Sequence, residues 1–135
     1  RQDMLRFDTG INPSDIQVTR SGNSLKLTLQ STGEVVTVQN HFINDSYMLN
    51  AVEFADGTSW DSATLALMVL IGTEGADSIT GFATDDIING LGGNDTLRGD
   101  GGNDSLNGGD GSDYLFGGTG DDTLSGGTSN GDSFS

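Results

Sequence analysis

The chain has no cysteine, one proline, one histidine and only five basic residues among its 135 residues. Without cysteine the fold contains no disulfide. Because the chain also lacks a Gly-x-Ser-x-Gly elbow, it cannot assemble a hydrolase triad or a zinc site, and we expect no enzymatic activity and no catalytic residues. No apolar run reaches the length of a membrane-spanning helix, and the first residues do not form a signal peptide.

Acidic residues are abundant and unevenly placed. Twenty acidic residues against five basic ones give a net charge of −15, which argues against nucleic acid or an anionic membrane as a partner. Residues 1–71 contain eight acidic residues, four basic residues and four glycines, whereas residues 72–135 contain twelve, one and eighteen. This change in composition predicts two domains, 1–71 and 72–135.

A nine-residue pattern repeats without insertion from Gly72 to Gly126. Each repeat begins with a glycine, has an aspartate five residues later and a branched aliphatic residue two residues after the aspartate. A sustained short period of this kind indicates a solenoid. The six aspartates are Asp77, Asp86, Asp95, Asp104, Asp113 and Asp122, and the aliphatic residues are Ile79, Ile88, Leu97, Leu106, Leu115 and Leu124.

Each repeat is expected to form a turn and then a three-residue strand. In a triplet such as Thr96-Leu97-Arg98, the middle side chain points to the opposite side from its neighbours, so it can face a core. Two repeats then make one coil of 18 residues. Turns of the odd-numbered repeats then lie on one edge of the roll, the odd edge, and those of the even-numbered repeats on the other, the even edge. This arrangement predicts two stacks of aspartates: Asp77, Asp95 and Asp113 on the odd edge, and Asp86, Asp104 and Asp122 on the even edge.

Stacked carboxylates at a strand spacing of roughly 4.8 Å repel one another unless a cation lies between them. The repeats offer carboxylate and carbonyl oxygens and no histidine or cysteine, a ligand set that favours Ca²⁺. Glycine permits a positive φ and lets carbonyl oxygens turn inward without a Cβ in the way. One buried aliphatic residue per repeat is too little to order nine residues, so ions are expected to supply the missing stability.

The segments GGNDTLRGD, GGNDSLNGG and GGTGDDTLSGG resemble the glycine-aspartate nonapeptide repeats of the RTX, or repeats-in-toxin, family. The resemblance covers residues 72–126 and implies a parallel β-roll that binds Ca²⁺ between turns, in proteins exported by type I secretion. Roughly four ions are expected, one in each gap between stacked turns. Besides the six aspartates, the expected site glycines are Gly72, Gly75, Gly81, Gly90, Gly93, Gly99, Gly102, Gly108, Gly111, Gly117 and Gly120.

Four positions depart from the repeat pattern. Thr84 and Ser129 replace the second glycine, Leu91 replaces a small residue, and position 131 is a glycine where an aspartate is expected. The departures fall on the first site of the even edge and the last site of the odd edge. In the second repeat, where Thr84 replaces the glycine, Asp85 lies beside Asp86 and is a candidate substitute ligand. The remaining array carboxylates, Asp100, Asp110 and Asp121, are interpreted as solvated surface charges.

Residues 1–71 are expected to form a small β-rich module. Alternating apolar residues predict strands over 16–20 and 24–30, with further strands over 35–42 and 49–54, so that a meander of antiparallel strands has one apolar face. Asp61 or Ser62 is a candidate cap for a short helix over 63–70, although 69–71 could equally be a strand that leads into the roll. His41 and Trp60 are interpreted as packing residues.

The segments GEVVTVQNHF and VEFADGTSWD resemble the haemolysin-type calcium-binding-related domain that flanks RTX arrays. This resemblance implies a module that starts, caps or joins rolls. Asp3-Met4-Leu5 and Asp132-Ser133-Phe134 repeat the aspartate-x-apolar spacing, the latter one residue out of register, which suggests a unit from a longer run with neighbouring RTX blocks.

The predicted function is therefore that of a calcium-binding segment of a secreted bacterial protein, which folds on Ca²⁺ after type I secretion to the cell surface or the exterior. Two alternatives stay open. The segment could be a calcium-stiffened structural or adhesive spacer in a large surface protein, or the accessory tail of an exported enzyme.

Overall fold

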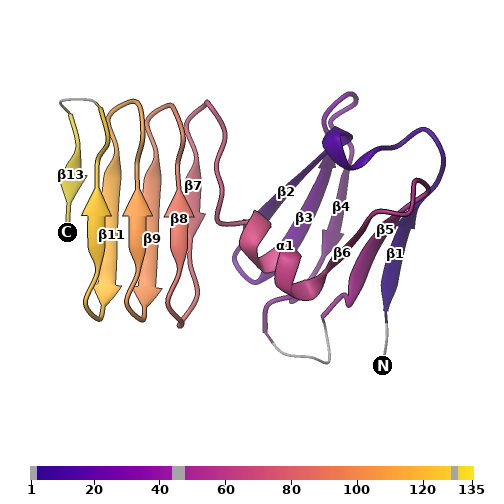
Figure 1. The fold of residues 1–135 in the computed structure, drawn as a ribbon, viewed down its shortest axis with the longest axis horizontal. Coiled ribbons are helices and arrows are strands. Elements are labelled where there is room, and N and C mark those ends of the chain that lie inside the picture. Colours follow the sequence, from indigo (N-terminus) through magenta and orange to yellow (C-terminus); the bar gives the residue numbers. More distant parts are fainter. Residues whose placement is uncertain (1–2, 44–47, 129–130) are drawn as a thin grey trace. The chain divides into compact units, whose positions relative to one another are not determined.

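The structure is a computed structural model and describes residues 3–43, 48–128 and 131–135. The chain divides into two compact units, Arg1–Val69 and Leu70–Ser135. Strands predominate in both units, and the part of the chain that the structure describes holds one short α-helix (Figure 1). The predicted fold class, a parallel β-roll preceded by a small β-rich module with one short helix, is confirmed.

The first unit contains an antiparallel meander of β2 (Ile16–Ser21), β3 (Ser24–Leu29) and β4 (Val35–Val38). A 3-10 turn, η1 (Pro13–Asp15), precedes it. The predicted alternation is seen directly, because Ile16, Val18, Leu25 and Leu27 are buried while the residues between them are more exposed. The periodicity of the sequence thus decides which face of this sheet is covered.

A second sheet in the first unit contains β1 (Met4–Phe7), β5 (Ala51–Phe54) and β6 (Ser59–Asp61), in the order β1-β5-β6. The expectation of one antiparallel meander is therefore wrong in two respects: the strands form two sheets, and β1 pairs with β5 in parallel. The turn at 55–58 instead closes a β5–β6 hairpin, where Gly57 adopts a φ of 94° and the N–H of Thr58 donates to Asp56. The strand expected over 49–54 begins only at Ala51.

The strand expected over 35–42 is also shorter than predicted, because β4 ends at Val38. Asn40 adopts a φ of 59°, which an extended strand cannot accommodate. The N–H of Phe42 then donates to the carbonyl of Asn23 at 3.0 Å. A left-handed residue therefore turns the chain away from the sheet, and His41 lies beyond the strand.

The helix α1 spans Ser62–Met68, and the side chain of Asp61 accepts a hydrogen bond from the N–H of Thr64 at 2.8 Å. Asp61 is therefore the N-cap, which settles the choice between Asp61 and Ser62. Leu65 of α1 is fully buried. In the core, Phe54 packs against Trp60 with ring centroids 4.7 Å apart, and Trp60 is a packing residue as predicted.

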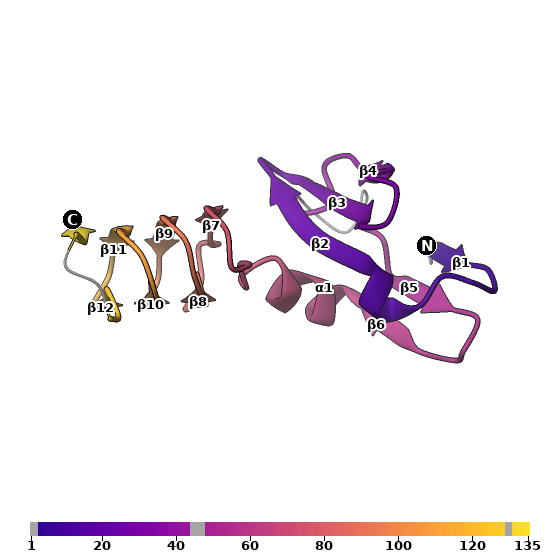
Figure 2. The same ribbon diagram turned by 90° about the horizontal axis from the view of Figure 1, so that it is seen from above.

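The second unit is a roll in which short strands from successive coils form two sheets, each with parallel strands (Figures 1 and 2). One sheet has the order β13-β11-β9-β7 and the other has the order β12-β10-β8. The strands are β7 (Ser78–Thr80), β8 (Ile87–Asn89), β9 (Thr96–Gly101), β10 (Ser105–Asn107), β11 (Tyr114–Thr119), β12 (Thr123–Ser125) and β13 (Ser133–Phe134).

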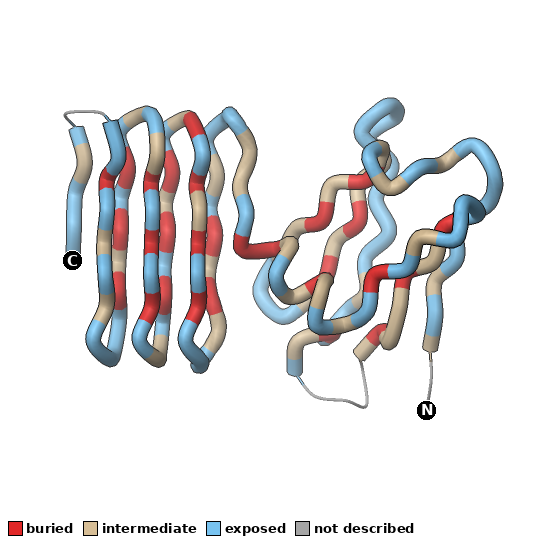
Figure 3. Tube along the Cα trace, viewed as in Figure 1, coloured by how far each residue is buried: buried red, intermediate tan, exposed pale blue. Residues whose placement is uncertain are grey.

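The predicted coil of 18 residues is confirmed by the register of the strands. Ile79 pairs with Leu97, and Leu97 pairs with Leu115; on the other sheet, Leu106 lies between Ile88 and Leu124. Four of these core residues, Ile88, Leu97, Leu106 and Leu115, are at most 1% exposed. The buried positions recur at the same height in successive coils (Figure 3).

The roll begins just after the helix. The N–H of Asn89 donates to the carbonyl of Leu70 at 3.0 Å, and Ile71 forms a parallel bridge with Asn89. Both predictions for residues 63–71 are therefore correct in part: the helix ends at Met68, and Leu70 and Ile71 bond to Asn89 of β8, the first strand of the even sheet.

Candidate metal centre

The six predicted aspartates occupy one equivalent position in the coil, immediately before a strand of the roll. Asp77 precedes β7, Asp95 precedes β9 and Asp113 precedes β11 on the odd edge; Asp86, Asp104 and Asp122 precede β8, β10 and β12 on the even edge. The structure thus brings them together in the two stacks that the sequence predicts.

Hydrogen bonds tie each stack together from coil to coil. The Oδ1 atom of Asp95 accepts from the N–H of Asp77 at 2.8 Å, and Oδ1 of Asp113 accepts from the N–H of Asp95 at 2.9 Å. On the even edge, Asp104 accepts from Asp86 and Asp122 accepts from Asp104 in the same way. Every carboxylate after the first in a stack therefore reaches back to the preceding coil through one oxygen and has its other oxygen for a different partner.

That second oxygen is buried and unpartnered in the middle of the stacks. Among the described residues, the Oδ2 atoms of Asp95, Asp104 and Asp113 are the buried side-chain oxygens without a hydrogen-bond partner. Each of these residues is only 2% exposed. Because an ionised oxygen that is buried without a partner is destabilising, these atoms fit a bound cation.

The first coil differs from the later ones. The Oδ2 atom of Asp77 accepts from the N–H of Thr73 at 2.6 Å, and Oδ2 of Asp86 accepts from the N–H of Phe82 at 2.6 Å. Thr73 and Phe82 follow the first glycines of their repeats, so each turn satisfies its own aspartate. We therefore expect the aspartates of the first coil to contribute less to ion binding than those of the middle coils.

The first glycine of each repeat lies directly beside the carboxylate of its own repeat. A Cβ atom on Gly90 would overlap Oδ2 of Asp95 and lie 2.6 Å from the carbonyl oxygen of Gly108, and a Cβ on Gly72 would lie 2.7 Å from Oδ2 of Asp77. These first glycines have no positive φ, so of the two reasons expected for glycine the one that applies to them is room for inward oxygens without a Cβ. Glycine is required because carboxylate and carbonyl oxygens converge where a side chain would be.

Positive φ values occur instead later in the turns. Gly93, Gly102, Gly111 and Gly120 have φ values between 99° and 128°, and among the predicted second glycines only Gly75 lacks one. Leu91, a departure from the repeat, also has a positive φ, of 75°. The backbone of this turn is therefore kept despite a side chain that disfavours it.

Burial and mutual repulsion raise the pKa of the central aspartates. For Asp95 the main cause is desolvation, and the neighbouring charges of Asp113 and Asp77 add to it, while the hydrogen bond from the N–H of Asp77 opposes it. Desolvation likewise raises the pKa of Asp104, and among the neighbouring charges that of Asp122 raises it most. The stacks disfavour their own negative charge, and a divalent cation would remove that penalty.

Backbone oxygens must complete any ion site in the roll. Among the described residues, no group of three or more acidic or histidine side chains converges on one point. Ca²⁺ is ligated by backbone carbonyl oxygens as well as by carboxylates, and the glycine turns bring both kinds of oxygen to the stacks. The donor set of stacked carboxylates and turn carbonyls fits Ca²⁺.

Sequence reasoning missed an outer ladder beside the aspartate stacks. Oδ1 of Asn94 accepts from the N–H of Ser112 at 2.9 Å, and Oδ1 of Asn103 accepts from the N–H of Asp121 at 2.9 Å. Asp85 holds the equivalent place, because its Oδ1 accepts from the N–H of Asn103 at 2.8 Å. That bond joins two coils through one oxygen of Asp85, and the role of Asp85 as a substitute ligand stays a prediction. The signal in the sequence was an Asn or Asp directly before most of the repeat aspartates.

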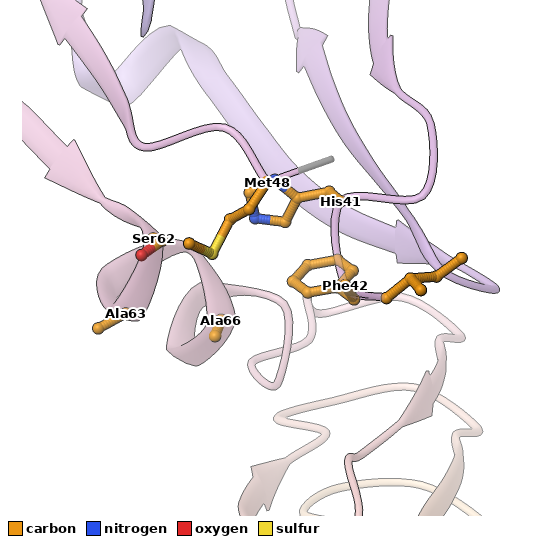
Figure 4. Close-up of a pocket in the computed structure, with 7 residues that line it drawn as sticks. His41, Phe42, Met48, Ser62, Ala63 and Ala66 are labelled. Atoms are coloured by element: carbon orange, nitrogen blue, oxygen red, sulfur yellow. The ribbon is translucent and has the colours of Figure 1, made fainter. Parts of the chain in front are cut away.

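The first unit contains a cavity of about 350 Å³ between α1 and the segment around His41 (Figure 4). His41 is 3% exposed, its Nδ1 accepts from the N–H of Leu49 at 3.0 Å, and burial lowers its pKa. Its ring meets that of Phe42 edge-on with centroids 4.6 Å apart. His41 is therefore a packing residue, as predicted, and its burial favours the neutral ring, whose Nδ1 accepts this hydrogen bond.

Known families match both units. Residues 25–64 match the haemolysin-type calcium binding protein related domain, and residues 69–97, 90–124 and 98–131 match the RTX calcium-binding nonapeptide repeat. A chain with this domain followed by this solenoid belongs to the RTX repeat proteins. Its second unit is a calcium-binding repeat segment.

The chain is also similar to one part of a much longer protein. It is 38% identical over 85 residues to the iron-regulated protein FrpA of Neisseria meningitidis serogroup C. The aligned region covers 61% of this chain and 8% of that protein, so the match spans less than a tenth of the length of this relative. No helix in the described part of the chain is long and apolar enough to cross a membrane.

Proposed function

We propose that residues 72–135 bind several Ca²⁺ ions between successive coils and that the roll is ordered only when the ions are bound. The observation that carries this proposal is the set of buried Oδ2 atoms without partners, in Asp95, Asp104 and Asp113. The aspartates of the two stacks and the carbonyls of the predicted glycine turns are the ligands. One ion in each gap between stacked turns gives roughly four ions.

The same physical features suit a protein that folds after export. Where calcium is scarce, repulsion among the carboxylates and the backbone entropy of the glycines keep the repeats unfolded, a state that can be threaded through a type I secretion channel. Millimolar calcium outside the cell then drives folding. The first unit is the module that precedes the roll and starts or caps it, and the segment itself is not an enzyme.

A second candidate function is supported by the length of the relative. Because the matching region is only 8% of that protein, segments of this kind occur within long chains. The segment would then act as a calcium-stiffened spacer in a large surface protein, next to further RTX blocks, or as the accessory tail of an exported enzyme. Its calcium chemistry is the same in each case.

The test is a titration of the whole chain from excess chelator with Ca²⁺ and, separately, with Mg²⁺, followed by far-ultraviolet circular dichroism. We expect a large gain of β structure with Ca²⁺ and a much weaker response to Mg²⁺, which requires octahedral geometry and retains its water. A spectrum that is the same in chelator and in millimolar Ca²⁺ would contradict the proposal.

A further inference from the structure

The odd stack continues beyond the last aspartate of the repeat pattern. Asp132 lies 19 residues after Asp113, one residue more than the coil, and position 131 is a glycine. Nevertheless, Oδ1 of Asp132 accepts from the N–H of Asp113 at 3.0 Å. This is the contact that Asp95 and Asp113 each make with the coil before them.

The surroundings of Asp132 repeat those of the regular members. Oδ2 of Asp132 lies where a Cβ on Gly126 would be, as Oδ2 of Asp95 does at Gly90. The strand that follows is also in place, because β13 pairs in parallel with β11 and the N–H of Ser133 donates to the carbonyl of Asp113 at 2.7 Å. The extra residue therefore lies between Gly126 and Asp132, and from Asp132 onward the chain is again in register with the preceding coil.

Asp113 shows the effect of this additional coil. The repeat pattern makes Asp113 the end of the odd stack and Asp122 the end of the even stack. Asp122 is partly exposed, whereas Asp113 is 2% exposed, as deeply buried as Asp95 in the middle of the stack. The Oδ2 atom of Asp113 is buried and has no hydrogen-bond partner among the described residues. Asp113 is thus as buried as an interior member of the stack, although the repeat pattern places it at the end.

From these contacts we infer that Asp113 and Asp132 form a further Ca²⁺ site at the end of the odd stack, which gives this edge one more ion than the even edge. The inference rests on the proposed function. The ligands are the carboxylates of Asp113 and Asp132 with carbonyl oxygens of the turn that begins at Gly108 and of residues 126–128. Position 131 does not substitute for Asp132, since a Cβ on Gly131 would lie 2.9 Å from the Cβ of Ser112.

The experiment counts the ions bound to the full-length chain by native mass spectrometry and calorimetric titration with Ca²⁺. Asp132→Asn keeps an oxygen that can accept from the N–H of Asp113 but removes the charge, and we expect it to bind one ion fewer than the parent. Asp121→Asn, at an exposed charged position in the preceding turn and outside the stacks, is the matched control and keeps the parent count. Circular dichroism at saturating Ca²⁺ verifies that each variant is folded.

A double variant tests whether a carboxylate at position 131, where the nine-residue pattern expects it, can replace Asp132. Gly131→Asp with Asp132→Asn moves the carboxylate to the position that the nine-residue pattern requires, and we expect that it does not recover the lost ion. A parent count retained by Asp132→Asn, or restored by the double variant, would overturn the inference while leaving calcium binding by the other coils intact. A parent chain that binds no Ca²⁺ would instead overturn the proposed function.

Discussion

The two units bury different kinds of side chain. In the first unit the fully buried residues include Leu25, Leu27, Val52 and Leu65, with Phe54 and Trp60 packed beside them. In the roll the first two coils each bury two aliphatic residues and the third buries Leu115, and beside them lie aspartates that are equally inaccessible. An apolar core is favourable without any ligand, whereas a buried carboxylate is not. The comparison predicts that the first unit is stable by itself and that the second depends on its ions.

Removal of calcium should have the largest effect and separate the units most clearly. Trp60 is the only tryptophan, and it lies in the core of the first unit. In excess chelator we expect far-ultraviolet circular dichroism to lose the β signal of the roll while the Trp60 emission keeps its native wavelength. A shift of the Trp60 emission to that of an exposed indole on chelation would show that the first unit also depends on the ions.

The next largest effect should come from the position of an aspartate within its stack. An interior aspartate faces a coil on both sides, so Asp95→Asn and Asp104→Asn should each lose about two ions and raise the Ca²⁺ concentration at half-folding. Asp77→Asn and Asp122→Asn should lose about one, and Asp77 already has its oxygens bonded to Thr73. Calorimetric titration of the four variants compares them. Equal losses at all four positions would mean that the ions do not bridge successive coils.

Substitutions of buried leucines test whether the two units have independent cores. Leu27→Ala in β3 should lower the free energy of unfolding of the first unit by about 2–5 kcal/mol, because it leaves a cavity in a packed core. The loss should be the same with Ca²⁺ and with chelator, as measured by urea unfolding followed at Trp60. Leu106→Ala in β10 is the matched change in the roll, and its effect should be seen only in the presence of Ca²⁺. A calcium-dependent effect of Leu27→Ala would contradict independent cores.

The roll could be predicted from the sequence more completely than the first unit. A repeat of nine residues sets the coil, the strand triplets and the two aspartate stacks, because each copy has the same local environment. The parallel pairing of β1 with β5 joins Met4 to Ala51 across 47 residues, and no local pattern encodes it. The left-handed Asn40, which ends β4 early, likewise has no periodic signal.

Even in the roll, spacing alone does not determine which atoms meet. It could not show that one oxygen of each interior aspartate bonds to the preceding coil while the other is left without a partner. Nor could it place Asp132, which is out of register by one residue and yet continues the odd stack. The sequence did contain the signal, the spacing Asp132-Ser133-Phe134, but only the pairing of β13 with β11 shows its meaning.

The smallest expected effect is an opposite response of the units to pH. The pKa values of Asp95 and Asp104 are raised in the folded roll, so protonation stabilises the calcium-free roll. This stabilisation is complete below 3.8, the ordinary value for aspartate, and is lost as the pH rises through the raised values. In chelator, circular dichroism should therefore show a modest gain of β structure on acidification. No gain would indicate that the carboxylates are too well hydrated to oppose folding.

His41 gives the opposite sign in the first unit. Burial lowers its folded pKa below 6.5, so the stabilisation by neutral His41 is present above 6.5 and is lost as the pH falls through the lowered value. Protonation would also place a proton on Nδ1, which accepts from the N–H of Leu49. The thermal midpoint followed at Trp60 should thus decline between pH 7 and pH values below the folded pKa. His41→Gln retains an acceptor but does not titrate, so its midpoint should be flat over the same interval; an equal decline in this variant would assign the pH response to another group.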